Sequence, residues 1–302
     1  MSSLTAQRWM RNLKVTRRNR PALAFTVLQP VIWMALFAEN FKQLANDPTF
    51  RDLGYTSYLS FFVPSILVLT VLNASTLSGV SMITDVNAGV LDKYLISPIK
   101  RSSILLGRIL ADGITMVFQC LIVLVIGIVL GARVHTGVAG VVVTIVLVVV
   151  LGMCFAALSC FVALHTRNAQ LTMIVSGLST LPLLLLSPAF YPAQLQAGWL
   201  RAVEKVNPAA HVVTAGQDLF NLRFDAGQLL ITVGVLALTA VLSFTATIRE
   251  FRRATSAAAG GGGLIRRLQE LHERVGVGPV AAPAIPTGAE PTREKIEADS
   301  RP

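Results

Sequence analysis

Long apolar runs separated by short polar stretches dominate this chain. An α-helix needs about 20 apolar residues to cross the hydrocarbon core of a bilayer, and most of the runs reach that length. The pattern therefore predicts an all-α polytopic membrane protein with six transmembrane helices. The runs lie at about residues 22–41, 57–83, 103–131, 138–164, 171–189 and 227–248.

The composition agrees with a protein of the bilayer. Of the 302 residues, 53% are hydrophobic and only 14% are charged, and the mean hydropathy is +0.64. The net charge of +10 does not indicate nucleic-acid binding, because the Lys and Arg residues flank the apolar runs, where anionic lipid headgroups attract them. Cys120, Cys154 and Cys160 lie inside apolar runs without metal-ligand spacing and are interpreted as small buried residues.

Positive charge beside the apolar runs predicts the orientation in the membrane. Lys and Arg gather at the N-terminus, around Lys100, around Arg167 and after the last run, whereas the other loops carry fewer for their length. Since positively charged flanks stay in the cytosol, both termini are expected to be cytosolic. We therefore expect a multi-pass protein of the cytoplasmic membrane.

Three parts are expected along the chain. Residues 1–20 are basic with interspersed apolar residues, which favours either an interfacial amphipathic helix or a simple positive flank for the first span. Residues 21–253 form the six-span transmembrane domain. Residues 254–302 begin with a glycine run at 260–263 and then contain Pro, Ala and Glu, so a flexible cytosolic tail is expected.

Polar residues inside the spans leave two interpretations open. Asn73, Ser75, Thr76 and Ser78 form a stripe in the second span, which either faces a substrate path or hydrogen-bonds to neighbouring helices.

The fourth and fifth spans differ in what their sequences indicate. The fourth span is so rich in Val, Ile and Leu that it is expected to face lipid. The fifth ends in Ser-Pro-Ala-Phe-Tyr-Pro at 187–192, where two prolines should break the helix near the outer face.

The segment at residues 193–224 is amphipathic, and a helix in it should stop at Asn207-Pro208. Together with the proline breaks, it predicts broken, re-entrant-like helices between the fifth and sixth spans. Its apolar residues at helical spacing are Leu195, Trp199, Leu200 and Val203.

The spans carry little chemistry of their own. The acidic group at mid-membrane that an ion or proton carrier needs is missing. Asp112 lies near the cytosolic end of the third span, where either Arg108 one turn earlier can pair with it or the lipid interface can solvate it. Glu39 lies near the outer end of the first span. Gln119 and His211 have no nucleophile or base partner in the sequence. An intramembrane hydrolase is therefore not supported.

Nucleotide chemistry is also absent from the sequence. A phosphate-binding P-loop needs Gly-Lys followed by Ser or Thr, and no lysine in the chain follows a glycine. We therefore expect no enzymatic activity and no cofactor bound by this chain. If ATP drives the protein, a partner subunit binds the ATP.

A charged stretch between the second and third spans departs from this pattern. The sequence there can form a short amphipathic helix that Asp85 caps and Pro98 ends. Such a rigid helix outside the bilayer can transmit a movement to the spans, which a flexible loop cannot. Its apolar face holds Val90, Leu91, Tyr94 and Leu95.

Two blocks of motifs follow one another along the chain. The first comprises Asp85, Gly89-Val90-Leu91-Asp92, Ser97-Pro98, Lys100-Arg101 and Leu106-Gly107-Arg108. The second comprises TRNAQ at 166–170, SPAFYP at 187–192, Trp199-Leu200 and Asn207-Pro208. In order and spacing they resemble the permease subunits of type-2 ATP-binding-cassette exporters, which include bacterial daunorubicin-type drug-resistance permeases. The resemblance covers about residues 22–253, with two departures: Val90 replaces the usual Thr, and Gln196-Ala197-Gly198 stands where a Pro is common.

The resemblance implies a membrane subunit that pairs with a second permease, identical or paralogous, and with two copies of a separate ATP-binding-cassette ATPase. It also implies that the loop after the second span is a coupling helix seated in a groove of the ATPase. The residues assigned to this helix are Asp85, Gly89, Val90, Leu91, Asp92, Lys93, Tyr94, Leu95 and Pro98.

We therefore expect an ATP-driven exporter that opens a path at its dimer interface, along the first, second and fifth spans. Its substrate would be an amphiphilic drug-like compound, a lipid or a glycan, because an apolar path carries no hydrogen-bonding pattern that identifies one of them. Two other classes stay open. One is a non-transporting membrane scaffold or assembly protein, and the other is a proton-coupled carrier, which the missing carboxylates disfavour.

Overall fold

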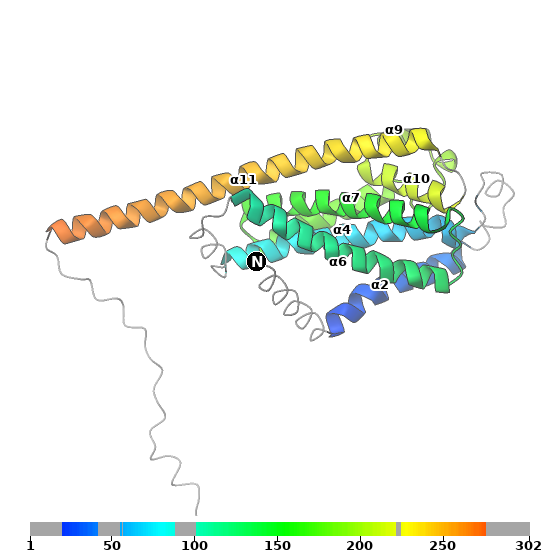
Figure 1. Ribbon diagram of the computed structural model, residues 1–302, viewed down its shortest axis with the longest axis horizontal. Coiled ribbons are helices and arrows are strands. Elements are labelled where there is room, and N and C mark those ends of the chain that lie inside the picture. Colours follow the sequence, from blue (N-terminus) through cyan, green and yellow to red (C-terminus); the bar gives the residue numbers. More distant parts are fainter. Residues whose placement is uncertain (1–19, 42–54, 56, 88–100, 222–224, 276–302) are drawn as a thin grey trace, which may run out of the picture. The chain divides into compact units, whose positions relative to one another are not determined.

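The computed structural model describes residues 20–41, 55, 57–87, 101–221 and 225–275, and every regular element in these ranges is helical (Figure 1). The helices are α2 (Arg20–Asn40), α4 (Tyr58–Asn87), α6 (Arg101–Val129), α7 (Gly137–Thr166), α8 (Ala169–Leu185), α9 (Gly198–Glu204), α10 (Pro208–Phe220) and α11 (Ala226–Val275). One turn of 3-10 helix, Ala193–Leu195, precedes α9.

Within the described residues, 4 helices are long and apolar enough to cross a membrane. Their spans are Tyr58–Val86, Leu105–Val129, Gly137–Thr166 and Ala226–Phe251. Helices α2 and α8 contribute shorter apolar segments, Leu28–Phe37 and Ala169–Leu185. The all-helical, multi-pass architecture expected from the sequence is confirmed, and four of the expected spans have the required length. The first and fifth spans stay predictions.

Helix α4 is the centre of the helical bundle. It packs against α2, α6, α7, α8 and α10, and 67% of its span is buried. Phe61, Leu67 and Val71 on α4 are completely buried in the main apolar core. A helix surrounded in this way fixes the positions of its neighbours relative to one another.

Helices α4 and α7 touch through small residues. A Cβ atom added to Gly79 would lie 2.5 Å from the carbonyl oxygen of Ser159 and closer still to its Oγ atom. About one turn away along α4, the hydroxyl of Ser75 donates to the carbonyl oxygen of Gly152 at 2.8 Å. Lipid is as apolar as leucine, so helices in a membrane associate mainly through such close backbone contacts and hydrogen bonds.

The expectation that the fourth span faces lipid is wrong. That span is α7, half of which is buried, and it also contacts α6, α8 and α10. Its Val, Ile and Leu content conceals a stripe of small residues at helical spacing that lies against α4. The stripe consists of Gly152, Ala156, Ser159 and Ala163, all buried. Apolar composition alone does not separate a lipid-facing helix from a central one.

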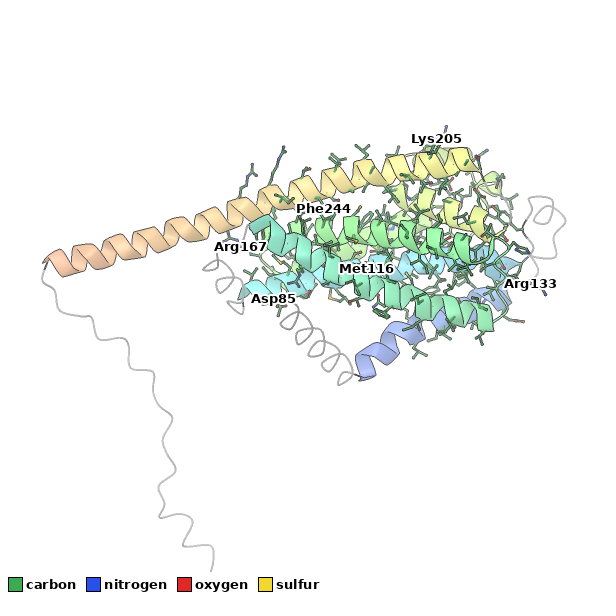
Figure 2. All side chains as sticks on the ribbon, in the orientation of Figure 1. Asp85, Met116, Arg133, Arg167, Lys205 and Phe244 are labelled. Carbon is green, nitrogen blue, oxygen red and sulfur yellow. The ribbon has the colours of Figure 1, made fainter. Side chains whose placement is uncertain are left out.

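Charged residues mark the two ends of the bundle. Figure 2 shows Asp85 and Arg167 near one end, and Arg133 and Lys205 near the other. Arg167 has a positive φ of 51° and ends α7. The next residue, Asn168, caps α8 by accepting hydrogen bonds from the backbone N–H groups of the following turn. The tight turn expected at Arg167 is therefore present.

The chain divides into two compact units, the first ending at Ala254 and the second beginning at Thr255. In the first, the inner part of α11 packs through Phe251 into a small apolar core with Met82 and Ile109. The last span, expected at about 227–248, corresponds to the apolar part Ala226–Phe251 of α11, and the helix itself continues to Val275. Most of the expected interfacial helix at 1–20, and residues 276–302 of the expected tail, lie outside the described residues.

We predict that Gly79→Ala destabilises the bundle, because the added methyl group meets backbone atoms of α7 that cannot move without separating the helices. Overpacking of this kind costs about 1–3 kcal/mol. The melting temperature of the detergent-solubilised protein should fall by several degrees. Gly234→Ala is the matched control, because open space surrounds Gly234. Equal melting temperatures for the two variants would contradict the tight contact.

Candidate functional site

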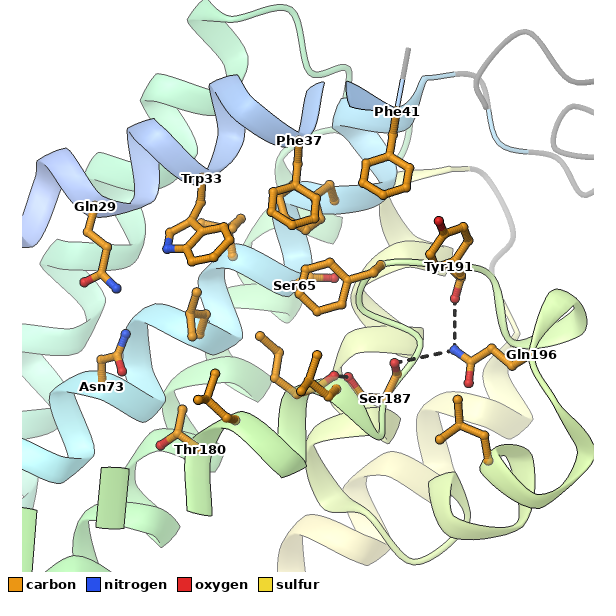
Figure 3. A pocket seen from close by; sticks show the side chains of 18 of the residues that line it. Gln29, Trp33, Phe37, Phe41, Ser65, Asn73, Thr180, Ser187, Tyr191 and Gln196 are labelled. Atoms are coloured by element: carbon orange, nitrogen blue, oxygen red, sulfur yellow. Dashed lines mark hydrogen bonds between the residues drawn. The ribbon is translucent and has the colours of Figure 1, made fainter. Parts of the chain in front are cut away.

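A cavity of about 680 Å³ lies between α2, α4, α8 and the segment after α8 (Figure 3). Its volume is within the range of pockets that hold drug-sized molecules. The lining residues are Gln29, Trp33, Phe37, Phe41, Phe62, Ser65, Ile66, Leu69, Asn73, Gly177, Thr180, Leu181, Leu184, Leu185, Ser187, Phe190, Tyr191, Gln196 and Leu200. We call this space the aromatic cavity.

Aromatic rings form the wall of this cavity toward the end of the bundle that carries Arg133. The ring of Phe37 lies 4.9 Å from that of Phe62 and 5.1 Å from that of Phe190, measured between centroids. The ring of Phe41 meets that of Tyr191 edge-on at 5.4 Å. Rings at these distances present flat apolar surfaces on which another aromatic group can stack.

Uncharged polar groups interrupt the apolar wall at a few points. Gln29 and Asn73 are at one end of the cavity, and Gln196 is at the other (Figure 3). The Nε2 atom of Gln196 donates to the backbone oxygen of Tyr191 at 3.1 Å. No charged side chain is among the lining residues. The cavity therefore suits a ligand with a large apolar body and a few neutral polar groups.

The helix break expected at residues 187–192 is present and closes one end of the cavity. Helix α8 ends at Leu185. The side-chain amide of Asn207 then donates to the carbonyl oxygens of Leu183 at 2.7 Å and Leu186 at 3.0 Å, which the break leaves without helical partners. Gln217 donates to the backbone oxygen of Pro188 at 2.8 Å. These bonds tie the broken segment to α10.

The helix stop expected at Asn207-Pro208 is present, and the same two residues begin the next helix. Helix α9 ends at Glu204, after which Asn207 caps α10 and Pro208 is in its first turn. Pro at that position has a fixed φ that suits a helix start. Of the apolar residues expected to form a face at 195–203, Leu195, Trp199 and Val203 are exposed, whereas Leu200 lines the aromatic cavity. The buried helix of this region is α10.

A second group of polar residues lies at the opposite end of α4. Arg108 on α6 forms an ion pair with Asp85 and donates to the hydroxyl of Ser81. Asp112, one turn further along α6, accepts a hydrogen bond from Ser78. A pair between Arg108 and Asp112 on the same helix was one of the two alternatives left open by the sequence. The ion pair of Arg108 is with Asp85, and it links α6 to α4 because the side chains of the two helices meet there.

Asp85 therefore differs from its expected capping role, because it lies inside α4 rather than before a new helix. The other residues assigned to the coupling helix fall at positions 88–100, outside the described residues. Their role stays a prediction. The structure does define both ends of this segment, since α4 ends at Asn87 and α6 begins at Arg101.

The polar stripe of α4 serves both roles that the sequence left open, hydrogen bonding between helices and lining of a cavity. Ser75 and Ser78 hydrogen-bond to neighbouring helices, and Thr76 bonds back to its own helix at Leu72. Asn73 lines the aromatic cavity.

The aromatic wall was not predicted from the sequence, although Trp33, Phe37 and Phe41 recur every four residues. The spacing places them on one face of a helix.

The lining of the aromatic cavity is uncharged. No group of three His, Cys, Asp or Glu residues among them is arranged to hold a metal ion. The polar side chains that line the cavity are amides and hydroxyls. Membrane-spanning helices around an apolar cavity of this kind are typical of membrane permeases, which bind and move a molecule without transforming it.

Sequence comparison identifies the family. Residues 5–221 match the model of the ABC-2 type transporter family, and the chain belongs to this family. The daunorubicin resistance ABC transporter permease DrrB1 of Streptomyces coeruleorubidus is 30% identical over 234 residues, which cover 75% of this chain and 78% of the relative.

Two further relatives agree. A probable doxorubicin resistance permease, DrrC, of Mycobacterium tuberculosis is 27% identical over 63% of this chain and 66% of its own length. The putative transport permease ycf38 of Cyanophora paradoxa is 26% identical over 80% of this chain and 88% of its own length.

Membership of the family confirms several expectations. The chain is the membrane permease subunit of an ATP-binding-cassette transporter, located in a membrane with several passes. ATP binds to a separate ATP-binding subunit with which the permease pairs, so the ATPase activity resides in that partner.

We predict a pH dependence of stability from Glu204, on the short helix α9. Burial raises the pKa of this carboxyl above its ordinary 4.5, against the opposing effects of a hydrogen bond from Gln196 and of nearby Arg201 and His211. The folded state therefore binds the proton more tightly than the unfolded state. This contribution to stability is fully present below pH 4.5 and is lost as the pH rises through the raised pKa.

Glu204→Gln should flatten the fall in melting temperature from about pH 4.5 to pH 7, with a change of at most about 2 °C because the group is partly exposed. Arg201→Gln is the opposing variant. It removes a cation that favours the ionised carboxylate, so the slope should steepen. Identical pH profiles for the two variants would exclude this role of Glu204.

Proposed function

We propose that this permease exports an amphiphilic, drug-like molecule through the aromatic cavity, driven by ATP hydrolysis in its partner. The observation that carries the proposal is the cavity itself, which is large, walled by rings and free of charged lining residues. The relatives named for daunorubicin and doxorubicin resistance support a substrate with a flat apolar body. Such a molecule can stack on Trp33 or Phe37.

We further propose six transmembrane helices with both termini in the cytosol. Under this topology α2 and α8 are the first and fifth spans. The placement of Asp85 and Arg167 at one end of the bundle, opposite Arg133 and Lys205, supports it, because the expected cytosolic turns then share one end (Figure 2). Pro30 inside α2 allows that helix to bend across the bilayer.

A second permease, identical or paralogous, completes the path in this proposal. The apolar face of α8 is exposed, with Leu178 at 68%, Leu181 at 58% and Leu185 at 58%. Leu181 and Leu185 also line the aromatic cavity, so a partner helix on this face would enclose the cavity. Two copies of the ATP-binding subunit would then serve the two permeases.

Coupling is assigned to the segment between α4 and α6. Because the ion pair between Arg108 and Asp85 joins the two helices beside this segment, a push on the segment would move α4 and α6 together. Helix α4 extends from this ion pair to the ring wall at Phe62, so the movement would reach the cavity. This link supports a coupling helix at 88–98.

The export function is tested by transport in proteoliposomes. The permease reconstituted with its ATP-binding subunit should accumulate daunorubicin only when ATP is supplied. Accumulation by the permease alone without ATP would overturn the proposal. The scaffold alternative would be favoured by a different result. In that case daunorubicin would not accumulate with or without ATP, and another membrane complex would depend on this chain for its assembly.

Trp33→Ala should lower the transport rate at limiting substrate by up to about tenfold, since one aromatic contact contributes about 0.5–1.5 kcal/mol. Trp199→Ala is the matched control, because Trp199 is 66% exposed and does not line the cavity. Equal losses in the two variants would indicate a general effect of removing a tryptophan.

The coupling segment is tested by Leu91→Asp and Tyr94→Ala. Each removes an apolar contact from the proposed ATPase-facing side, so co-purification of the ATP-binding subunit should fall severalfold while membrane insertion is retained. Val206→Asp controls for an added carboxylate at an exposed apolar position, since Val206 is 82% exposed at the other end of the bundle. If the ATP-binding subunit co-purified equally well with both variants, the assignment of this segment as the coupling helix would be rejected.

A further inference from the structure

A second cavity of about 370 Å³ adjoins the first and is bounded by α2, α4 and α6. It shares Gln29, Trp33, Leu69 and Asn73 with the aromatic cavity, so the two spaces are neighbours. The remaining lining residues are Pro30, Thr70, Ala74, Leu77 and Gln119. We call this space the amide cavity.

Three primary amides converge on the amide cavity from three helices. Gln29 is on α2, Asn73 on α4 and Gln119 on α6. Figure 3 shows the amide groups of Gln29 and Asn73 pointing toward one another. The Oε1 atom of Gln119 is buried and has no hydrogen-bond partner among the described residues.

The amide of Gln119 differs in its bonding from two hydroxyl side chains of the neighbouring helix α4. Thr70 on the same cavity bonds back to the carbonyl oxygen of Ile66 at 2.7 Å, and Ser75 bonds to α7. No hydrogen bond to a described residue satisfies the Oε1 atom of Gln119. An unpaired amide inside a membrane protein costs free energy, so residues of this kind commonly bind something that enters.

The lining defines the chemistry of the molecule that fits. Charged side chains are absent from the lining of both cavities, which disfavours an ion as the ligand. A primary amide both donates and accepts, so it pairs with a hydroxyl or a carbonyl group. Trp33, which borders both spaces, offers a flat surface for the apolar part of the same molecule.

We propose that the amide cavity is a binding site for the neutral polar end of an aromatic amphiphile, with Gln119, Asn73 and Gln29 hydrogen-bonding to its hydroxyl or carbonyl groups. The inference rests on the proposed function, since it names the class of substrate that the export path accepts. Gln119 is the distinguishing residue, because it lines the amide cavity and not the aromatic cavity.

The test compares two neutral planar probes that differ in one hydroxyl, 9-anthracenemethanol and 9-methylanthracene. Full-length protein is placed in lipid nanodiscs with Trp9 and Trp199 replaced by Phe, which leaves Trp33 as the remaining tryptophan. Binding is followed by energy transfer from Trp33 to the anthracene ring. Empty nanodiscs and an excess of unlabelled lipid correct for probe dissolved in the bilayer.

Gln119→Met, which keeps the length of the side chain but removes its amide, should weaken binding of 9-anthracenemethanol about tenfold, the effect of losing one hydrogen bond of the ligand. Binding of 9-methylanthracene should change less than about twofold. Asn73→Leu should give the same selectivity and serves as the independent variant. Gln170→Met, at an exposed glutamine outside both cavities, should leave both affinities unchanged.

The melting temperature of the ligand-free protein separates binding from a structural role. If the amide of Gln119 awaits a ligand, Gln119→Met should leave the melting temperature unchanged or raise it, because an unpaired polar atom is removed. A lowered melting temperature together with equal losses for both probes would overturn the inference. So would unchanged binding of the hydroxyl probe in both Gln119→Met and Asn73→Leu.

The outcome is distinguishable from failure of the proposed function. ATP-dependent transport tests the export function, whereas probe selectivity is measured on the permease without ATP or its partner. Selective binding without transport would retain the amide site and reject the exporter. Transport without selective binding would retain the exporter and reject the amide site.

Discussion

The close contact between α4 and α7 is the constraint on which the rest of the bundle depends. Inside a bilayer, water does not drive apolar helices together, so the backbones must approach closely enough for packing and hydrogen bonds to act. Gly79 against Ser159, and Ser75 bonded to Gly152, provide this approach. Helices α6, α8 and α10 each contact both members of the pair and take their positions from it.

Helix α4 links the features that matter for function. Asp85 near its C-terminal end pairs with Arg108 beside the proposed coupling segment. Asn73 in its middle borders both cavities. At its N-terminal end, Phe62 stacks in the ring wall and the hydroxyl of Tyr58 donates to the carbonyl oxygen of Phe190. A displacement of one packed helix would therefore act on all three places, because a close-packed interior does not deform smoothly.

Polar residues in the described spans serve three purposes that sequence alone does not separate. Thr76 donates its hydroxyl hydrogen bond to a backbone oxygen of its own helix. Ser75 and Ser78 hydrogen-bond to neighbouring helices, and Asn73 and Gln119 line cavities. Each of these side chains is polar and uncharged, so the residue type fits any of the three roles. What decides is the rotation of each helix about its axis, which packing against neighbours sets.

The sequence by itself determined the class of structure. Run length and hydropathy indicate spanning helices because a bilayer has a fixed thickness and lipid cannot hydrogen-bond a free backbone. Local rules also predicted a helix break at 187–192 and a turn at Arg167, and the structure has both, with α8 ending at Leu185 and Arg167 in the left-handed conformation. The ordered motifs pointed to the family to which the chain belongs.

The tertiary structure decided three further points. Helix α7 is central rather than lipid-facing, and Arg108 pairs with Asp85 on another helix rather than along its own helix. Rings from α2 and α4 meet those after α8 around a cavity. These outcomes depend on which faces of distant segments meet, and that choice is made by small residues and by packing volume rather than by the apolar pattern of any single helix.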